Sequence, residues 1–343
     1  MKVTLQEIAR LAGVSKATVS RVLNEKESGV SETTRKRVQL LLDEMEYQQN
    51  VAGRRTSSSK TKIIGLIIPD VLNPFFPQLL QSVENCASAN GYTVLLGNSN
   101  HSKEREGKYI AAFLARGVDG IILTTATDDY GKLQANIKLL NKSNVPCVLM
   151  DRAAANDVTA FGVYVDNEFG MFSACDYLIK SGHKRIAFIT GPTGLSTSLE
   201  RLNGYKEALQ HHKLSFDEGL VAVGKYTMQS GYDAVVSFQE AHVEFSAVLA
   251  ANDIMALGAM QAVAQFGYRI PEDIEIIGFD NIEFSSISSP PLSTVEQPVS
   301  DMGRTAVERL IDLINGKQLK VSRHCLEPRL VLRGTTKQEE FKG

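Results

Sequence analysis

Long apolar runs are missing from this chain, and its cysteines are few. No stretch is apolar and long enough to span a bilayer, and the opening residues MKVTLQEIAR contain no signal-peptide core. We therefore expect a cytoplasmic protein that makes no contact with a membrane. The four cysteines form no CxxC pair and have apolar neighbours, so buried reduced thiols are expected rather than disulfides or a zinc site. They are Cys86, Cys147, Cys175 and Cys325.

Familiar catalytic signatures are also absent from the sequence. The chain has no Walker loop, no HExxH, no GxSxG, and no GxGxxG after an expected strand. Its six histidines have no metal-binding spacing to one another or to a cysteine. The sequence thus predicts no enzymatic activity, no metal and no cofactor.

What the chain does contain is a globular composition with unevenly distributed charge. Of its 343 residues, 43% are hydrophobic and 22% are charged, which suits two or three domains. The net charge is −2, yet residues 1–62 contain twelve lysines and arginines against seven acids. A basic segment ahead of an acidic remainder concentrates attraction for phosphate at one end of the chain.

Residues 4–24, TLQEIARLAGVSKATVSRVLN, predict two short helices joined by a tight turn. Apolar residues recur at helical spacing in both halves, and Gly13 lies between them, where a left-handed turn residue is needed. Ser15 is a suitable N-cap for the second helix. The other face of that helix is small, polar and basic, so it can lie in a DNA major groove. An unspecific amphipathic hairpin is the alternative, but it would not require these three features together.

The remaining pattern predicts two further regions after this motif. A third helix at residues 31–46 completes a small helical headpiece, and the Ser-rich, basic residues 48–62 form a linker. From residue 63, short apolar runs alternate with amphipathic helices, which is typical of parallel sheets covered on both faces. This alternation occurs twice, so we expect an α/β body of two doubly wound lobes. Strands are expected at 63–68, 93–96, 120–123, 145–150, 161–165, 185–190, 220–223, 247–250, 274–278 and 293–295.

The motif AxxAGVSxATVSRVLN, at residues 9–24, resembles the lactose-repressor (LacI/GalR) family of bacterial transcription regulators. The resemblance extends from Thr4 to about Thr335. It implies an all-α helix-turn-helix headpiece followed by a two-lobed α/β effector domain that resembles periplasmic sugar-binding proteins. The implied division is a headpiece at 1–47, a hinge at 48–62, an N-terminal lobe at 63–161 and 292–323, a C-terminal lobe at 162–291 and 324–335, and a tail at 336–343.

Polar and aromatic residues follow the expected strands, where open α/β sheets bind ligands. Aromatic rings can cover the C–H faces of a sugar, while carboxylates, amides and guanidinium groups bond its hydroxyls. For any single residue, a helix cap, a surface charge or a core position is an alternative, but the set together suits a monosaccharide. The set is Asn73, Phe75, Phe76, Asp151, Arg152, Arg201, Asn252, Asp280 and Gln297.

The motifs NPFF, DR, LERLNGY, AND, GFD and EQP resemble the ribose-type branch of this family. That resemblance implies that the polar members of the set bond the sugar and that Phe75 and Phe76 stack on it. It adds Tyr226, at a position where the aromatic residue is usually Phe. Because the Tyr226 hydroxyl could bond the oxygen of a sixth carbon or a carboxylate, a larger sugar or a sugar acid stays open as the ligand.

For DNA, the resemblance implies base contacts in the major groove from Lys16, Ala17 and Arg21. Ala17 offers only an apolar contact, such as one to a thymine methyl. The remaining polar positions of the headpiece match phosphate contacts. They are Thr4, Ser15, Thr18, Ser20, Asn24, Ser31 and Thr34.

The hinge only partly matches the family pattern PNxxARSL. Asn50 and Arg54 match it, and Arg55 can reach a phosphate or a groove. Gln49, Gly53 and Thr56 depart from it; Gly lowers helix propensity by about 1 kcal/mol, and Thr is a poorer wedge between bases than Leu. We therefore expect operator binding that depends strongly on ionic contacts and hence on salt.

Together these patterns predict a repressor of a sugar-utilisation operon. A homodimer would bind pseudo-palindromic, double-stranded operator DNA, and helices at 78–89 and 254–265 are candidates for the dimer contact. A small sugar between the lobes, ribose as the best guess, would control it allosterically. The alternative is a catabolite-control-type regulator that uses a phosphocarrier protein, or a different sugar or sugar acid, as co-effector. A sugar-transport protein is a third hypothesis, which the DNA-binding segment disfavours.

Overall fold

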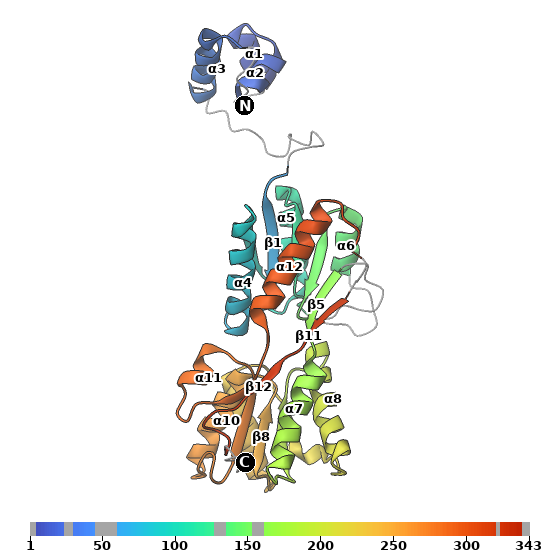
Figure 1. Cartoon of the computed structure of the whole chain (residues 1–343). Coiled ribbons are helices and arrows are strands. Elements are labelled where there is room, and N and C mark those ends of the chain that lie inside the picture. Colours follow the sequence, from blue (N-terminus) through green and yellow to red (C-terminus); the bar gives the residue numbers. More distant parts are fainter. Residues whose placement is uncertain are drawn as a thin grey trace, which may run out of the picture. The chain divides into compact units, whose positions relative to one another are not determined.

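The computed structural model describes residues 5–23, 30–44, 60–126, 135–152, 161–319 and 323–337. The chain divides into two compact units, residues 1–59 and 60–343 (Figure 1). Most of the expected hinge lies outside the described residues. So do five of the expected DNA contacts, namely Thr4, Asn24, Asn50, Arg54 and Arg55.

The first unit contains the three expected helices, α1 (Leu5–Ala12), α2 (Lys16–Leu23) and α3 (Glu32–Glu44). Gly13 joins the first two with a φ of +63°, a conformation that glycine adopts without steric cost. The helices meet around a small apolar core, which gives the helix-turn-helix its fixed shape. The core consists of Ile8, Ala9, Ala12, Val19, Val22, Val38 and Leu42, with Val14, Val30 and Leu41 at its margin.

The second unit has two lobes, each built on a six-stranded sheet (Figure 1). In the first lobe the strand order is β11-β5-β4-β3-β1-β2, and all neighbours are parallel. Its strands are β1 (Ile63–Ile68), β2 (Thr93–Asn98), β3 (Gly120–Leu123), β4 (Cys147–Met150), β5 (Phe161–Val165) and β11 (Arg323–Leu326). The helices α4 (Phe75–Ala89) and α12 (Val299–Ile314) pack on one face, and α5 (Lys103–Arg116) and α6 (Ala135–Ser143) on the other.

In the second lobe the order is β12-β10-β9-β8-β6-β7, with only β12 antiparallel to its neighbour. The strands are β6 (Ile186–Thr190), β7 (Val221–Val223), β8 (Ala247–Ala250), β9 (Glu275–Asp280), β10 (Ser293–Glu296) and β12 (Arg329–Val331). The covering helices are α7 (Asn167–Lys180), α8 (Ser196–His211), α9 (Met228–Glu240) and α10 (Asp253–Gln265), and the short α11 (Glu283–Ile287) follows β9. Two doubly wound lobes were expected, and this fold class is confirmed.

Sheet pairing moves three of the expected lobe boundaries. β5 pairs with β4 and so belongs to the first lobe, although a boundary at residue 161 assigned it to the second. β10 pairs with β9 in the second lobe, and β11 pairs with β5 in the first. The chain therefore passes between the lobes three times, after β5, β10 and β11. Apolar periodicity indicates that a strand forms, but it does not indicate which sheet the strand joins.

All four cysteines are free, as expected, but their burial differs. Cys175 is buried, Cys86 and Cys147 are half-buried, and Cys325 is exposed. Cys325 is exposed because β11 is the edge strand of its sheet, so the expectation of burial is wrong for this residue.

Within the described ranges, no helix is long and apolar enough to cross a membrane. The same residues contain no group of three or more His, Cys, Asp or Glu side chains arranged to hold a metal ion.

Candidate functional site

Side chains that follow the strands of both sheets line one pocket between the lobes. All ten of the expected effector-binding residues line it, together with Thr197, which was not among the expected residues. The first lobe contributes Asn73, Phe75, Phe76, Asp151 and Arg152; the second contributes Arg201, Tyr226, Asn252 and Asp280; and Gln297 lies where the chain leaves β10.

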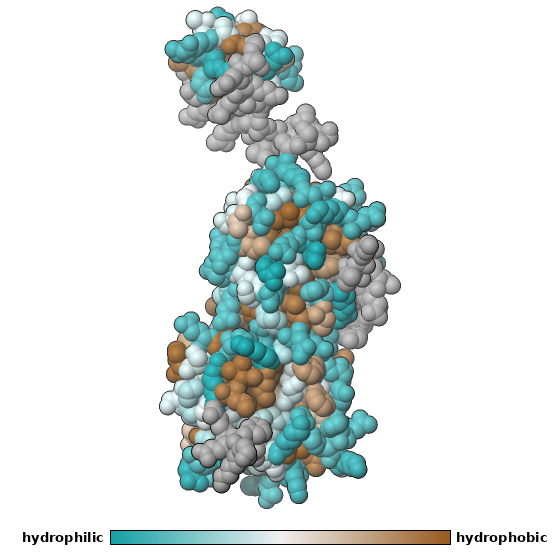
Figure 2. All heavy atoms as spheres, in the orientation of Figure 1, coloured by the Kyte–Doolittle hydropathy of each residue, from teal (hydrophilic) through white to brown (hydrophobic). Residues whose placement is uncertain are grey.

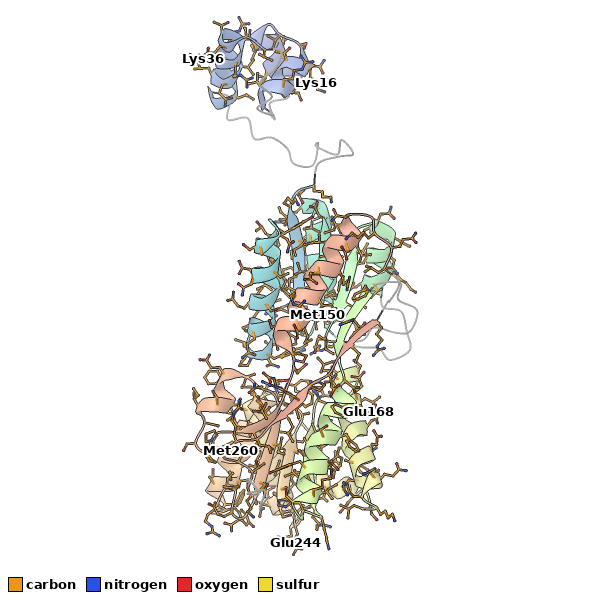
Figure 3. The ribbon with its side chains drawn as sticks, viewed as in Figure 1. Lys16, Lys36, Met150, Glu168, Glu244 and Met260 are labelled. Atoms are coloured by element: carbon orange, nitrogen blue, oxygen red, sulfur yellow. The ribbon has the colours of Figure 1, made fainter. Side chains whose placement is uncertain are left out.

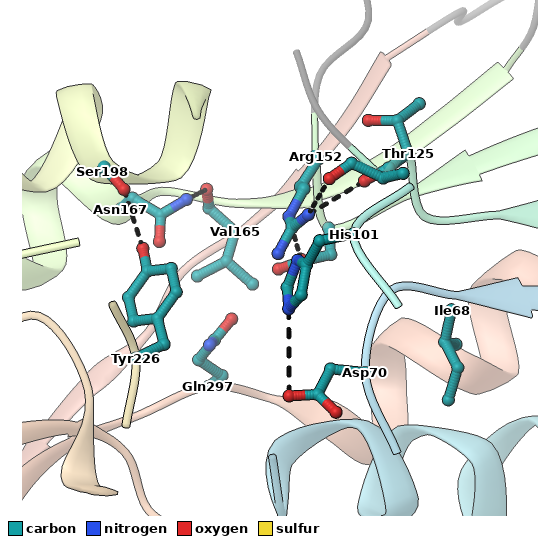
Figure 4. A network of polar contacts seen from close by, with 12 residues as sticks. Ile68, Asp70, His101, Thr125, Arg152, Val165, Asn167, Ser198, Tyr226 and Gln297 are labelled. Carbon is teal, nitrogen blue, oxygen red and sulfur yellow. Dashed lines mark hydrogen bonds and ion pairs between the residues drawn. The ribbon is translucent and has the colours of Figure 1, made fainter. Parts of the chain in front are cut away.

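Arg152 is the main charged group on the side of the first lobe (Figure 4). It is buried, and its Nη1 donates hydrogen bonds to the carbonyl oxygens of Thr125 at 2.9 Å and Ala126 at 3.1 Å. Its Nε lies 3.8 Å from a carboxylate oxygen of Asp151. Beside it, the rings of Phe75 and Phe76 meet edge to face with centroids 5.1 Å apart, which provides an apolar wall.

Arg201, on α8, is the corresponding group of the second lobe. Its Nε donates to Oδ1 of Asn167 at 2.9 Å, its Nη1 donates to the carbonyl of Ala251, and its Nη2 lies 3.9 Å from Asp280. The guanidinium carbon lies 3.8 Å from the ring centroid of Phe279, so the group stacks on an aromatic face in a cation–π contact. These contacts fix the position of the guanidinium.

Three polar atoms of the pocket are buried without a hydrogen-bond partner. They are Nε of Arg152, Nδ2 of Asn252 and Oε1 of Gln297, out of six such side-chain atoms in the described part of the chain. The other end of each amide is engaged, since Asn252 Oδ1 accepts from Met255 N and Gln297 Nε2 donates to Asp280. Buried polar groups without partners are unfavourable, and a hydroxylated ligand could satisfy them.

The ring of Tyr226 lines the pocket, and its hydroxyl lies 3.0 Å from Oγ of Ser198 (Figure 4). Gly191 lies beside this pair; a Cβ there would come within 2.3 Å of the tyrosine hydroxyl and 2.4 Å of Ser198 Oγ. The hydroxyl therefore already has a protein partner, and the ring is held in place by it.

Backbone conformation is unusual at three residues of the pocket. Asp151, Tyr226 and Asp280 have φ values of +68°, +58° and +117°. Such values are uncommon for residues other than glycine, cost free energy, and cluster at functional sites.

Burial also changes the acidity of the pocket. It raises the pKa of the Asp280 carboxyl to about 7, and the charge of Asp151 acts in the same direction. Arg201 and the hydrogen bond from Gln297 act in the opposite direction and only partly offset the effect of burial. Behind it, burial and the neighbouring Asp280 also raise the pKa of Asp253, whose carboxylate accepts from Ile282 N at 2.9 Å.

The pocket is nearly filled by its own side chains. Its volume is about 20 Å³, close to the smallest space that holds one water molecule. A ligand the size of a monosaccharide would need the Arg201, Asp280 and Gln297 groups to separate from their present partners, or the lobes to move apart.

The residues expected to read DNA bases lie on α2. Lys16, Ala17 and Arg21 are exposed, and Thr18 and Ser20 are half-buried beside them (Figure 3 labels Lys16). Ser15 is exposed and caps the helix, because its Oγ accepts from Thr18 N at 3.1 Å. Ser31 Oγ likewise accepts from the backbone N–H of Thr34 at 3.3 Å at the start of α3.

Three residues that matter to the pocket were missed in the sequence. Asn167 is the second residue after β5, so the rule that ligand groups follow strands could have found it. Thr197 and Ser198 lie in the first turn of α8, near Arg201, but nothing in the local sequence separates them from other small polar residues.

Two families of known proteins match this chain, one in the helical headpiece and one in the two-lobed body. Residues 4–50 match the bacterial regulatory proteins of the lacI family, and residues 175–336 match a periplasmic binding protein-like domain. The ribose operon repressor of Halalkalibacterium halodurans is 36% identical to the chain, covering 98% of each protein. Catabolite control protein A of Priestia megaterium is 34% identical, covering 98% of this chain and 100% of the relative.

Among solved structures, the lac repressor dimer bound to operator and the anti-inducer ONPF is similar over nearly the whole chain. The TM-score is 0.76 at 29% identity, with 98% of this chain and 99% of that chain covered. Two of these three proteins are repressors by name, and the similarity to all three includes both the helical headpiece and the two-lobed body.

Proposed function

Because this chain belongs to the lacI family of bacterial regulatory proteins, we propose that it represses a sugar-utilisation operon and that a small sugar between its lobes controls its binding to DNA. The chain is a transcription regulator and not an enzyme. D-Ribose is the first candidate for the sugar, on the strength of the pocket chemistry and the 36% identical ribose operon repressor.

The observation that carries this proposal is the shared pocket of the ten expected residues. Three aromatic rings, two arginines and two aspartates line it, which suits a ring with apolar faces and a rim of hydroxyls. Arg152 Nε, Asn252 Nδ2 and Gln297 Oε1 supply two donors and one acceptor that have no hydrogen-bond partner. A ligand that lacked a matching hydroxyl would leave such groups unsatisfied, so the site would select strongly among sugars.

For DNA, we propose that Lys16, Ala17 and Arg21 read bases. The exposure of all three on α2 supports this role. Ser15, Thr18, Ser20, Ser31 and Thr34 are proposed to contact phosphates, as are Thr4, Asn24, Asn50, Arg54 and Arg55, which lie outside the described residues.

A homodimer is part of the proposal, because a reader of palindromic DNA requires two headpieces. Of the two candidate helices, α10 has the better surface. Leu257, Met260 and Tyr268 line a pocket of about 340 Å³ beside it, and in nearby α11 the side chains of Phe284 and Ile287 are 52% and 70% exposed. Hydrophobic side chains gather in this region of the second lobe (Figure 2). The outward residues of α4, by contrast, are polar, including Gln81, Glu84 and Asn85.

The proposed control is allosteric and acts through the three inter-lobe connections. Sugar binding would change how the lobes meet, and the dimer would transmit that change to the headpieces. Sugar and operator affinities must then alter each other by the same factor.

A thermal-shift screen over pentoses, hexoses, sugar acids and their phosphates tests the sugar half of the proposal. D-Ribose, or a close relative, should raise the melting temperature by an amount that grows with the logarithm of its affinity, because it binds only the folded state. A screen in which no sugar changes the melting temperature would refute it.

A catabolite-control-type regulator is the second candidate, supported by the 34% identical catabolite control protein A. Its co-effector would be a phosphocarrier protein or a different sugar or sugar acid. A pull-down with a phosphorylated carrier protein distinguishes the two: tight binding without any sugar favours this alternative.

A further inference from the structure

A buried carboxylate lies behind the pocket without lining it. Glu106, on α5, has no exposed surface. Its Oε2 accepts a hydrogen bond from the backbone N–H of Ala126 at 2.6 Å, and its Oε1 accepts from Nδ2 of Asn136 on α6 at 2.8 Å. A buried charge is costly unless it is hydrogen-bonded, so these contacts fix the carboxylate firmly.

The peptide group that Glu106 holds is the same one that holds Arg152. The N–H of Ala126 and the carbonyl of Thr125 belong to a single planar peptide unit. Glu106 binds the N–H of that unit, and Arg152 Nη1 donates to its carbonyl at 2.9 Å. Nη1 also donates to the next carbonyl, that of Ala126, at 3.1 Å. The carboxylate thus sets the orientation of the plane on which the guanidinium rests.

We propose that Glu106 is a positioning residue for Arg152 and thereby sets the affinity of the pocket for its sugar. This inference rests on the proposed function, in which Arg152 bonds the sugar. Glu106 orients the peptide, and the peptide anchors Nη1 of Arg152. The Nε of Arg152 has no hydrogen bond within the protein and can therefore donate one to the sugar. The negative charge of the Glu106 carboxylate beside the N–H also polarises the peptide, which makes its carbonyl oxygen a stronger acceptor for Arg152.

Glu106→Gln is the informative substitution because it keeps the size of the side chain. The two carboxylate oxygens of Glu106 accept from Ala126 and Asn136 separately. A glutamine has an amide nitrogen, which is a donor, in place of one of these oxygens, so it cannot accept at both positions. Asn136 cannot rotate freely to compensate, since its Nδ2 also donates to the carbonyl of Lys103 at 2.8 Å. The peptide would be held by a neutral, weaker hydrogen bond or by none.

The experiment measures D-ribose affinity by calorimetry for the full-length chain. Glu106→Gln should weaken it by about five- to tenfold, the range expected for loss of a charge-assisted hydrogen bond that acts through one intermediary. The matched control is Glu104→Gln, an exposed glutamate of the same helix whose Oε1 lies 2.7 Å from Nζ of Lys108; it should change affinity less than twofold. Operator binding without sugar should be the same in all variants, which shows that they are folded.

A double-mutant cycle separates positioning from general stability. In an Arg152→Lys background, Glu106→Gln should have less than a twofold further effect, because the group that it positions has been replaced. An equal loss in both backgrounds would overturn the inference while leaving the proposed function intact. If Glu106→Gln fails to fold, Glu106→Asp, which keeps the charge, replaces it in the same cycle. Absence of sugar binding by the wild-type chain would overturn both the function and the inference.

Discussion

Gln297 donates a hydrogen bond from its Nε2 to Oδ1 of Asp280 across 2.7 Å. Asp280 ends β9 in the second lobe, and Gln297 begins the connection that leads from β10 to α12 in the first. The contact therefore joins the floor of the pocket to one of the three links between the lobes. A ligand that competes for the Asp280 carboxylate would act on that link directly.

The buried Asp280 should make the sugar-free protein less stable as pH rises. Its pKa is raised from the ordinary 3.8 to about 7, so the folded state holds a proton that the unfolded state has lost between these values. Stability is therefore lost as pH rises from about 4 to about 7. Between pH 5 and pH 8 this amounts to about 2–3 kcal/mol, or roughly 5 °C in the melting temperature of the body.

Asp280→Asn should remove that part of the pH dependence. We expect the change in melting temperature between pH 5 and pH 8, measured by calorimetry, to be smaller in the variant by about 5 °C. Equal changes in variant and wild type would show that Asp280 is ionised throughout this range.

Tyr226→Phe tests whether the hydroxyl of Tyr226, at a position where phenylalanine is usual, contacts the ligand. Because the hydroxyl bonds Ser198, its removal should change D-ribose affinity by less than about fivefold, the size of one neutral hydrogen bond. Tyr226→Ala, which removes the ring as well, should cost more. A loss above tenfold for the phenylalanine variant would mean that the hydroxyl touches the ligand, and a six-carbon sugar or a sugar acid would become the better candidate.

Lys16 and Arg21 should contribute more to operator binding than other headpiece cations. Lys16→Ala and Arg21→Ala are each expected to cost about 1–3 kcal/mol and to relax the choice of base at one position. Lys36→Ala is the matched control, because this exposed lysine lies on α3 with its Nζ 3.4 Å from Glu32 (Figure 3). Band-shift titrations with the operator and with single-base variants measure both effects. Equal losses for Lys36 and Arg21 would contradict the assignment of the reading face.

Operator affinity should also be unusually sensitive to salt. Ala17 offers no hydrogen bond to a base, and Gly53 and Thr56 weaken the hinge as a wedge, so phosphate contacts should supply more of the affinity. The slope of log K against log salt should be steeper than that of a relative whose hinge has the usual leucine. A slope that is equal or shallower would count against this account of the headpiece.

Much of the fold and of the pocket could be predicted because both depend on local pattern. Apolar periodicity located the strands, and polar residues after strands located the side chains that converge between the lobes, as with Asp151 and Asp280. The assignment of β5, β10 and β11 to their sheets could not be predicted, since pairing depends on partners far away in the chain.

The strands and side chains that surround the pocket residues could not be predicted from the sequence either. β11 and β12 are three or four residues long and have no fully buried residue, so they lack a clear apolar signal. Glu106 follows an ordinary polar pattern at the start of α5, and only the fold brings it to the N–H of Ala126, twenty residues later. Asn167 reaches Arg201 across 34 positions for the same reason.

The most direct test of the central claim is operator binding by the wild-type chain and Arg201→Ala, each with and without saturating D-ribose. Arg201 lines the pocket and contacts Asn167, Ala251 and Asp280. Arg269, the matched control, forms an exposed pair with Asp273 on the same lobe. We predict that ribose changes operator affinity at least fivefold, the lower end of typical allosteric coupling, in the wild type and in Arg269→Ala. Arg201→Ala should bind operator normally and ignore ribose. Loss of operator binding by Arg201→Ala with its ribose response intact would contradict the account.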